Sequence, residues 1–224
     1  MIYLLPLFLE IIVLFFLSRL MSRTLSQFMS INFLSVIFLP GIIVHELSHL
    51  LVAIVLFVPV GNMEFIPKRH GNSVKLGSVE IGKTDPIRRS LIGFAPVFVG
   101  FSIISTAVYY FSSNILFLQS QGAYVFVILT IFLAYLLFAV SNTMFSSSKD
   151  MEGTAEILIT LFIIFVAAYL LGFHPQLSVL NKIFTKEFVE LIRKSEFFLL
   201  APIMIDLFIL GGIRAIIYKR QRQT

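Results

Sequence analysis

Long runs of apolar residues alternate with short polar segments along the chain. Six of these runs are long enough to cross the roughly 30 Å hydrocarbon core of a bilayer as helices. They occupy residues 2–20, 31–58, 86–111, 122–141, 151–172 and 197–217. The first run lacks a basic start and a small-residue cleavage site, which indicates a retained span rather than a signal peptide. The pattern therefore predicts an all-α polytopic membrane protein with about six transmembrane helices.

The second run contains a proline, Pro40, at which a helix is expected to be interrupted. As one helix, residues 31–58 would extend about 42 Å, which is longer than the hydrocarbon core. Proline removes a helical hydrogen bond and clashes with the preceding turn. We therefore expect a kink or a break at Pro40.

The segment between the second and third runs has the pattern of strands. Apolar and polar residues alternate over 62–66 and, less regularly, over 73–83. Gly77 interrupts the second alternation, which suggests a bulge, and His70-Gly71-Asn72 supplies turn residues between the two. This segment predicts a small β-hairpin at the membrane surface.

Three other segments separate the spans. Residues 22–30 read as a polar linker, and residues 112–121 as a short uncharged loop. Residues 178–195 place apolar and charged side chains at helical spacing, which predicts an amphipathic helix at the membrane interface.

Composition agrees with a membrane protein. Of the 224 residues, 58% are hydrophobic and 13% are charged, and the mean hydropathy is +0.97. A soluble domain has about 45–50% apolar and about 25% charged residues. Six spans with their loops leave no room for a separate soluble domain, so residues 1–224 are expected to form one integral-membrane domain. The chain has no cysteine, which excludes disulfides, thiolate ligands and a cysteine nucleophile.

The basic residues predict the orientation in the membrane. With six spans, both termini lie on one side together with eleven lysines and arginines, and six lie on the other side. Because cytoplasmic loops carry the excess, we expect the termini, the hairpin and the opening of any site near it in the cytoplasm, with the chain in the cell membrane. Basic residues beside spans account for the net charge of +5, so the lipid bilayer is an expected partner and nucleic acid is not.

The most informative motif lies inside the second run, where His45-Glu46-Leu47-Ser48-His49 is an HExxH sequence. Histidines four residues apart lie on one face of a helix, where two imidazoles can bind one metal ion. Glu46 would lie beside the open position of the ion and could take a proton from water there. Ionisable residues at membrane depth are costly unless they bind or pair, so a metal site is favoured over a chance match.

The third run contains small residues and a proline. Gly93, Ala95 and Gly100 permit close approach of another helix. Pro96 frees a backbone carbonyl, because it has no N–H to donate. Helix packing alone could explain all four residues.

Two acids follow the fourth run, after a serine-rich segment that begins near Asn142. Asp150 and Glu152 lie where the next helix would begin, and acids there can simply stabilise the helix N-terminus. Roughly 14 Å of helix separates His49 from the cytoplasmic end of its span. Asp150 would enter from that same face, so the histidines and this acid can meet.

The combination resembles the site-2 protease family of intramembrane zinc metalloproteases. Residues 45–49 resemble the family's first core helix, and Gly93-Phe94-Ala95-Pro96 is similar to the Gly-Pro stretch of the second. Asn142 followed by Asp150 has the spacing of the family's Asn…Leu-Asp-Gly motif. The predicted hairpin is similar to the family's membrane-associated β region, whose edge helps hold substrate. The resemblance covers about 35–153, a three-helix metalloprotease core, which leaves 1–30 and 154–224 as accessory helices.

This resemblance implies a site and an activity. His45, His49 and Asp150 would bind Zn²⁺, Glu46 would act as the catalytic general base, and Asn142 would contact the substrate backbone. The reaction would hydrolyse a peptide bond in or near the transmembrane segment of a single-span membrane protein. Such a substrate must unwind locally, so a water-filled cavity open to the cytoplasm is expected.

The third metal ligand stays open in the sequence. Lys149 stands where the family has Leu, and Gly153 follows Asp150 by three residues rather than one. Glu152 is the nearest substitute. Glu156 would serve in another zinc-peptidase class, in which a glutamate from a later helix is the third ligand.

Two functions without proteolysis also fit the motif. A zinc transporter or sensor would need further ligands along a route through the bilayer, for which Glu10 and Asp206 are the clear candidates. Each of these acids could instead pair structurally. An inactive scaffold would keep the fold and bind single-span proteins without cleaving them, although the intact Glu46 argues against it.

Overall fold

The computed structural model describes residues 4–64, 68–70, 73–75, 77–145, 163, 166, 167, 170, 172 and 186–221. Within these residues the chain is mostly helical, with seven helices and two small antiparallel sheets. The helices are α1 (Leu4–Phe28), α2 (Ile31–Ile37), α3 (Leu39–Val55), α4 (Pro86–Ser113), α5 (Ile115–Ser120), α6 (Ala123–Thr143) and α9 (Lys186–Gln221). The strands are β1 (Val60–Glu64), β2 (Lys68–His70), β3 (Ser73–Lys75) and β4 (Ser78–Ile81). The predicted span at 151–172 lies almost entirely outside the described residues, and Asp150, Glu152 and Glu156 lie outside them as well.

The second apolar run is divided into α2 and α3, which meet at Phe38 with a bend of 75°. Pro40 lies in the first turn of α3, where its missing N–H costs no helical hydrogen bond. The predicted break is therefore confirmed, two residues before the proline. As a result, α3 is a separate helix of 17 residues that contains the whole HExxH motif.

Helices α3, α4 and α6 pack against one another, with close approaches at two glycines. A Cβ added to Gly41 of α3 would lie 2.6 Å from the carbonyl carbon of Ala139 on α6. One added to Gly100 of α4 would lie 2.9 Å from the Cβ of Met144, directly after α6. The close approach predicted at Gly100 is confirmed, and the three helices expected to form the core are in mutual contact.

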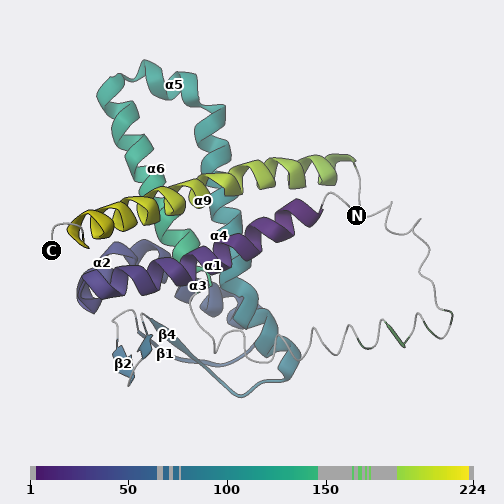
Figure 1. The fold of residues 1–224 in the computed structure, drawn as a ribbon. Coiled ribbons are helices and arrows are strands. Elements are labelled where there is room, and N and C mark those ends of the chain that lie inside the picture. Colours follow the sequence, from purple (N-terminus) through teal and green to yellow (C-terminus); the bar gives the residue numbers. More distant parts are fainter. Residues whose placement is uncertain are drawn as a thin grey trace.

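The connection between α4 and α6 is itself helical. Figure 1 shows α5 joining these two helices at one end. The sequence predicted a short uncharged loop at residues 112–121. Asn114 instead ends α4 and begins α5, with its side-chain amide donating to the carbonyl of Tyr110 over 2.8 Å.

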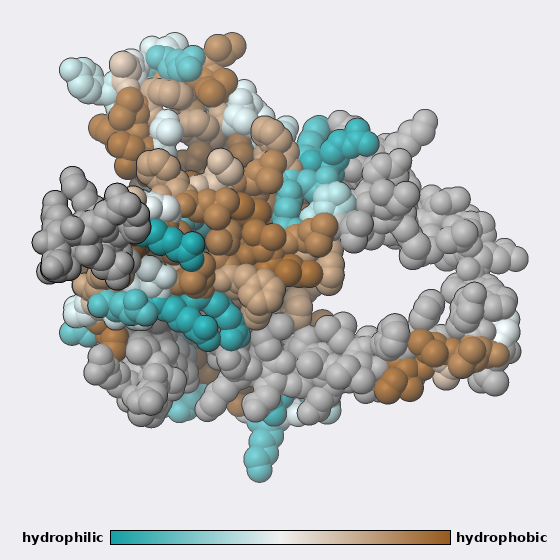
Figure 2. Space-filling view, in the orientation of Figure 1, coloured by the Kyte–Doolittle hydropathy of each residue, from teal (hydrophilic) through white to brown (hydrophobic). Residues whose placement is uncertain are grey.

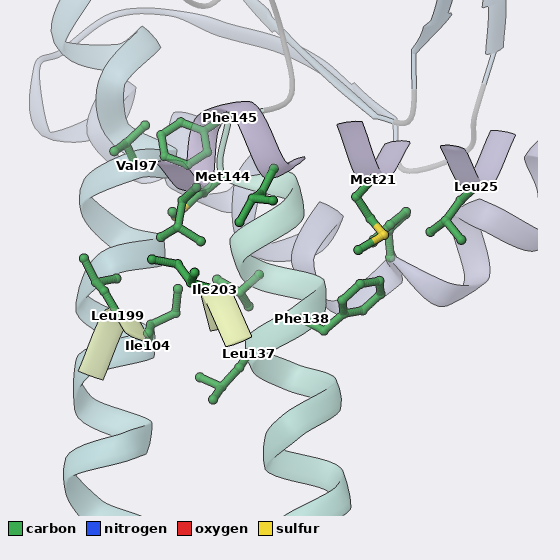
Figure 3. Close-up of a cluster of buried hydrophobic side chains, with 14 of the residues drawn as sticks. Met21, Leu25, Val97, Ile104, Leu137, Phe138, Met144, Phe145, Leu199 and Ile203 are labelled. Carbon is green, nitrogen blue, oxygen red and sulfur yellow. The ribbon is translucent and has the colours of Figure 1, made fainter. Parts of the chain in front are cut away.

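Helices α1 and α9 lie side by side and run across α4 and α6 (Figure 1). Their buried side chains join those of α4 and α6 in one apolar core, part of which is drawn in Figure 3. Its members include Met21 of α1, Ile104 of α4, Phe138 of α6 and Leu199 of α9. This core attaches the two outer helices to those that pack on α3.

Both outer helices are longer than the sequence pattern predicted. α1 continues to Phe28 through the expected polar linker, because Leu25 there is buried in the core. α9 runs without a break from Lys186 to Gln221, so the described part of the predicted amphipathic helix and the last span form one helix. Residues 186–201 contain no glycine or proline that would interrupt it.

The N-terminus of α4 is capped. The backbone N–H of Arg88 donates to Oδ1 of Asp85 over 3.0 Å, and Pro86 takes the first helical position. This hydrogen bond holds the pKa of the Asp85 carboxyl below its usual value. The cap fixes the point at which the chain passes from the sheet region into α4.

The segment between α3 and α4 forms two short antiparallel pairs, β1 with β4 and β2 with β3. His70 is opposite Ser73, so the turn lies where the sequence predicted it. The register shift lies on β1, between Val60 and Met63, whereas the predicted bulge was at Gly77. That prediction is wrong because Gly77 precedes β4 and lies against α3, so it separates two strands instead of bulging within one.

In the part of the chain that the structure describes, three helical segments are long and apolar enough to cross a membrane: α4, α6 and residues 196–215 of α9. α2 and α3 make a fourth if the bent pair counts as one span. Among the described helices α1, predicted as the first span, is not one of these candidates. Hydrophobic side chains cover much of the visible helical surface in Figure 2, and Phe98 of α4 and Phe132 of α6 are 64% and 59% exposed. So large an apolar surface needs a covering such as lipid, as in a multi-pass membrane protein.

Candidate metal centre

The two histidines of the HExxH motif point their Nε2 atoms at each other. His45 and His49 lie one turn apart on α3 and are each 4% exposed. Their Nε2 atoms are 3.1 Å apart, and the ring planes are inclined at 84°. Two nitrogens that each bind a tetrahedral zinc ion at about 2.0–2.1 Å are separated by about 3.3 Å. The two nitrogens share a hydrogen bond in this structure, and their spacing is close to that of two ligands of one zinc ion.

The second nitrogen of His49 is held by the backbone of α4. Nδ1 of His49 lies 2.8 Å from the carbonyl oxygen of Ile92, and the contact is buried. A carbonyl accepts only, so Nδ1 donates, and in a neutral ring the lone pair is on Nε2, where it accepts from the Nε2–H of His45 in this structure and is the electron pair that a metal ion would take. Metal-binding histidines usually make a contact of this kind with their other nitrogen, which fixes the ring orientation.

Glu46 is buried beside the histidines and lies against the sheet region. Its side chain is 5% exposed. A Cβ added to Gly77 would lie 2.6 Å from Oε1 of Glu46 and 3.0 Å from its carboxyl carbon. The short segment that leads into β4 therefore packs directly on the expected general base, and a larger residue at position 77 would displace the carboxylate.

Asn142 lies on the last turn of α6 and is paired within the protein. Its Nδ2 donates to the carbonyl of Phe138 over 3.0 Å and to Oδ1 of Asp206 on α9 over 2.7 Å. Asn142 is 4% exposed and Asp206 is fully buried. Among the described residues, Oδ1 of Asn142 and Oδ2 of Asp206 have no hydrogen-bond partner. A contact from Asn142 to a substrate backbone would thus use its carbonyl oxygen, since both amide hydrogens are already donated.

The described part of the chain brings together two of the expected metal ligands. Among the residues that the structure describes, no three His, Cys, Asp or Glu side chains are placed to hold one metal ion. Asp150 and its substitutes Glu152 and Glu156 lie outside the described residues. The end of α6 nevertheless packs against α3 at Gly41, which is one turn before His45 on the same helix face.

Three contacts near the site were not predicted from the sequence: Ile92 with His49, Gly77 with Glu46, and Asp206 with Asn142. Pro96 was the available clue for the first, because a proline leaves the carbonyl four residues earlier without its helical donor. No sequence pattern relates Gly77 to Glu46 or Asp206 to Asn142, because both pairs meet only through the tertiary fold.

No known protein family, curated protein or solved structure matches this chain.

Proposed function

We propose that this chain is an intramembrane zinc metalloprotease of the site-2 protease type, which hydrolyses a peptide bond in or near a transmembrane segment. The observation that carries the proposal is the geometry of the histidine pair. The Nε2 atoms of His45 and His49 face each other at 3.1 Å, and His49 is oriented through its Nδ1. Two buried imidazoles arranged in this way, next to a buried glutamate, have the donor set of a hydrolytic zinc site.

Asp150 is the proposed third ligand. It follows Phe145, the last described residue after α6, by five positions, and five extended residues span up to about 17 Å. The chain leaves α6 close to Gly41, one turn from His45, so this length is sufficient to return to the histidines. Glu152 and Glu156 remain the alternative ligands.

Glu46 is the proposed general base. The chemistry that a bound zinc ion supplies is the activation of water as a nucleophile near neutral pH. Glu46 accepts a proton as the water attacks the peptide carbonyl and returns it to the leaving amine. Gly77 limits how far the Glu46 carboxylate can move, because the backbone of the β4 segment lies against it.

The proposed architecture has about six spans around a three-helix core at about 35–153, formed by α3, α4 and α6. The substrate is a single-span membrane protein whose helix unwinds before cleavage. An unwound segment exposes backbone donors and acceptors that the sheet edge near β4 can pair with, as in β-strand addition. The termini and the opening of the site are proposed to face the cytoplasm.

Metal analysis combined with cleavage assays tests this function. Purified protein is expected to contain zinc, and His45→Ala is expected to lose it. Glu46→Gln should keep the fold and the zinc but fail to cleave single-span substrates that the unaltered protein cleaves. Unaltered protein without zinc, or full activity in Glu46→Gln, would contradict the proposal. Zinc binding without cleavage of any single-span protein would favour a transporter, a sensor or an inactive scaffold.

A further inference from the structure

We propose that Pro96 is a positioning residue for the metal site. By withholding a helical hydrogen bond, it leaves the Ile92 carbonyl as the acceptor that orients His49. The inference rests on the proposed zinc function, because it assigns a role in metal binding to a residue that does not touch the metal.

The proline inside α4 interrupts the pattern of helical hydrogen bonds there. In an α-helix, the N–H of each residue donates to the carbonyl four positions earlier. Pro96 lies inside α4, four positions after Ile92, and it has no N–H. Its ring also crowds the Ile92 carbonyl and turns it away from the helical direction. The carbonyl of Ile92 is therefore both without its usual donor and displaced.

Burial makes a replacement donor necessary. Ile92 and Pro96 are both fully buried in α4. A buried carbonyl without a hydrogen bond costs free energy, and nearly all such groups in folded proteins are paired. The donor in this structure is Nδ1 of His49, at 2.8 Å from the oxygen.

The same hydrogen bond determines how His49 can bind a metal. It places the ring proton on Nδ1 and so leaves the lone pair on Nε2, the atom that faces Nε2 of His45. It also restricts rotation of the ring about the bond between Cβ and Cγ. Removing the partner of a ligand's other nitrogen typically weakens metal binding about 10–100-fold.

The stability of Pro96→Ala distinguishes a positioning role of Pro96 from a purely structural one. Proline inside a helix is unfavourable, so Pro96→Ala should leave the protein as stable as before or more stable. If Pro96 served only to shape α4, metal affinity would change only together with stability. A loss of zinc affinity without a loss of stability separates the two roles.

The test compares Pro96→Ala with Pro202→Ala in the purified full chain in detergent. Pro202 is also fully buried inside a helix, α9, and therefore controls for removing a helical proline. We expect zinc affinity, measured by competition with a chelator, to fall about 10–100-fold in Pro96→Ala and to stay unchanged in Pro202→Ala. The melting temperature of Pro96→Ala should stay equal or rise.

A second measurement does not require zinc. The chain has four histidines, so nitrogen chemical shifts of labelled imidazoles can report the position of each ring proton. Metal-free unaltered protein should show His49 protonated at Nδ1, and Pro96→Ala should reduce that fraction. The inference is overturned if Pro96→Ala retains both the affinity and the shifts, because the carbonyl would then serve two donors at once. The inference is also overturned if the melting temperature of Pro96→Ala falls together with its zinc affinity. If the unaltered protein binds no zinc, the proposed function fails, while the chemical shifts still decide whether Pro96 orients His49.

Discussion

Nδ2 of Asn142 and Oδ1 of Asp206 are joined by a buried hydrogen bond of 2.7 Å. The two residues are 64 positions apart, on the last turn of α6 and in the middle of α9. A hydrogen bond to a charged or acidic group in an apolar interior is stronger than one at the surface. This bond therefore fixes α9 to the end of α6, from which the chain continues toward Asp150.

Replacing Asp206 should separate loss of the acceptor from loss of the carboxyl group. Asp206→Leu leaves a buried amide hydrogen of Asn142 without a partner, which should lower the free energy of unfolding by about 1–3 kcal/mol. Asp206→Asn keeps an acceptor and adds hydrogens that could reach the unpaired Oδ1 of Asn142, so its stability should remain close to that of the unaltered protein. Denaturant unfolding in detergent measures both. Equal stability of the two variants would show that this hydrogen bond contributes little.

A methyl group at Gly41 should weaken the contact between α3 and α6. The added Cβ would lie 2.6 Å from the carbonyl carbon of Ala139, a backbone atom that cannot turn aside. Overpacking of this kind costs about 1–3 kcal/mol, so Gly41→Ala should lower the free energy of unfolding by about that amount. Gly211→Ala is the matched control, because it lies in α9 with open space around it and should be neutral or slightly stabilising. A neutral Gly41→Ala would mean that the two helices are not so close.

A methyl group at Gly77 should impair catalysis and spare metal binding. It would displace the Glu46 carboxylate, and a displacement of about 1 Å can cost on the order of 100-fold in rate. Zinc content should stay unchanged, because the atoms nearest the added methyl group belong to Glu46 and not to either imidazole. Gly61→Ala in β1 is the control, since its nearest neighbour is the flexible, exposed end of Glu80. Normal cleavage by Gly77→Ala would show that the contact between Gly77 and Glu46 does not affect catalysis.

The identity of the third ligand can be decided by comparing three variants. Asp150→Ala should weaken zinc binding by more than the 10–100-fold expected for a residue that only supports a ligand, about 100-fold or more. Glu152→Ala and Glu156→Ala should retain normal zinc content. Elemental analysis and chelator competition measure both quantities. Zinc loss in Glu152→Ala with retention in Asp150→Ala would move the ligand to Glu152.

The local features of the site follow from the sequence. His45 and His49 face each other because residues four apart lie on one side of a helix, whatever the remainder of the fold. The break before Pro40 and the free carbonyl near Pro96 follow from the chemistry of proline, which acts within four residues. Such features depend on short-range geometry and were predicted correctly.

Other features depend on contacts between distant segments and could not be predicted. The expected bulge at Gly77 is instead a close contact with Glu46 on another element, and Asp206 pairs with Asn142 rather than standing alone. The polar residues near Ser22 suggested a linker, but the helix continues because the next turns bury Leu25. In each case a tertiary contact outweighed the local pattern.

Because α9 is one uninterrupted helix of 36 residues, its length at 1.5 Å per residue is about 54 Å. A helix of this length fits a bilayer with a hydrocarbon core of about 30 Å only if the helix tilts or extends beyond the lipid. The tilt of a helix depends on the thickness of the surrounding membrane. Since Asp206 on the same helix accepts a hydrogen bond from Asn142, a change in the tilt of α9 would be transmitted to the end of α6.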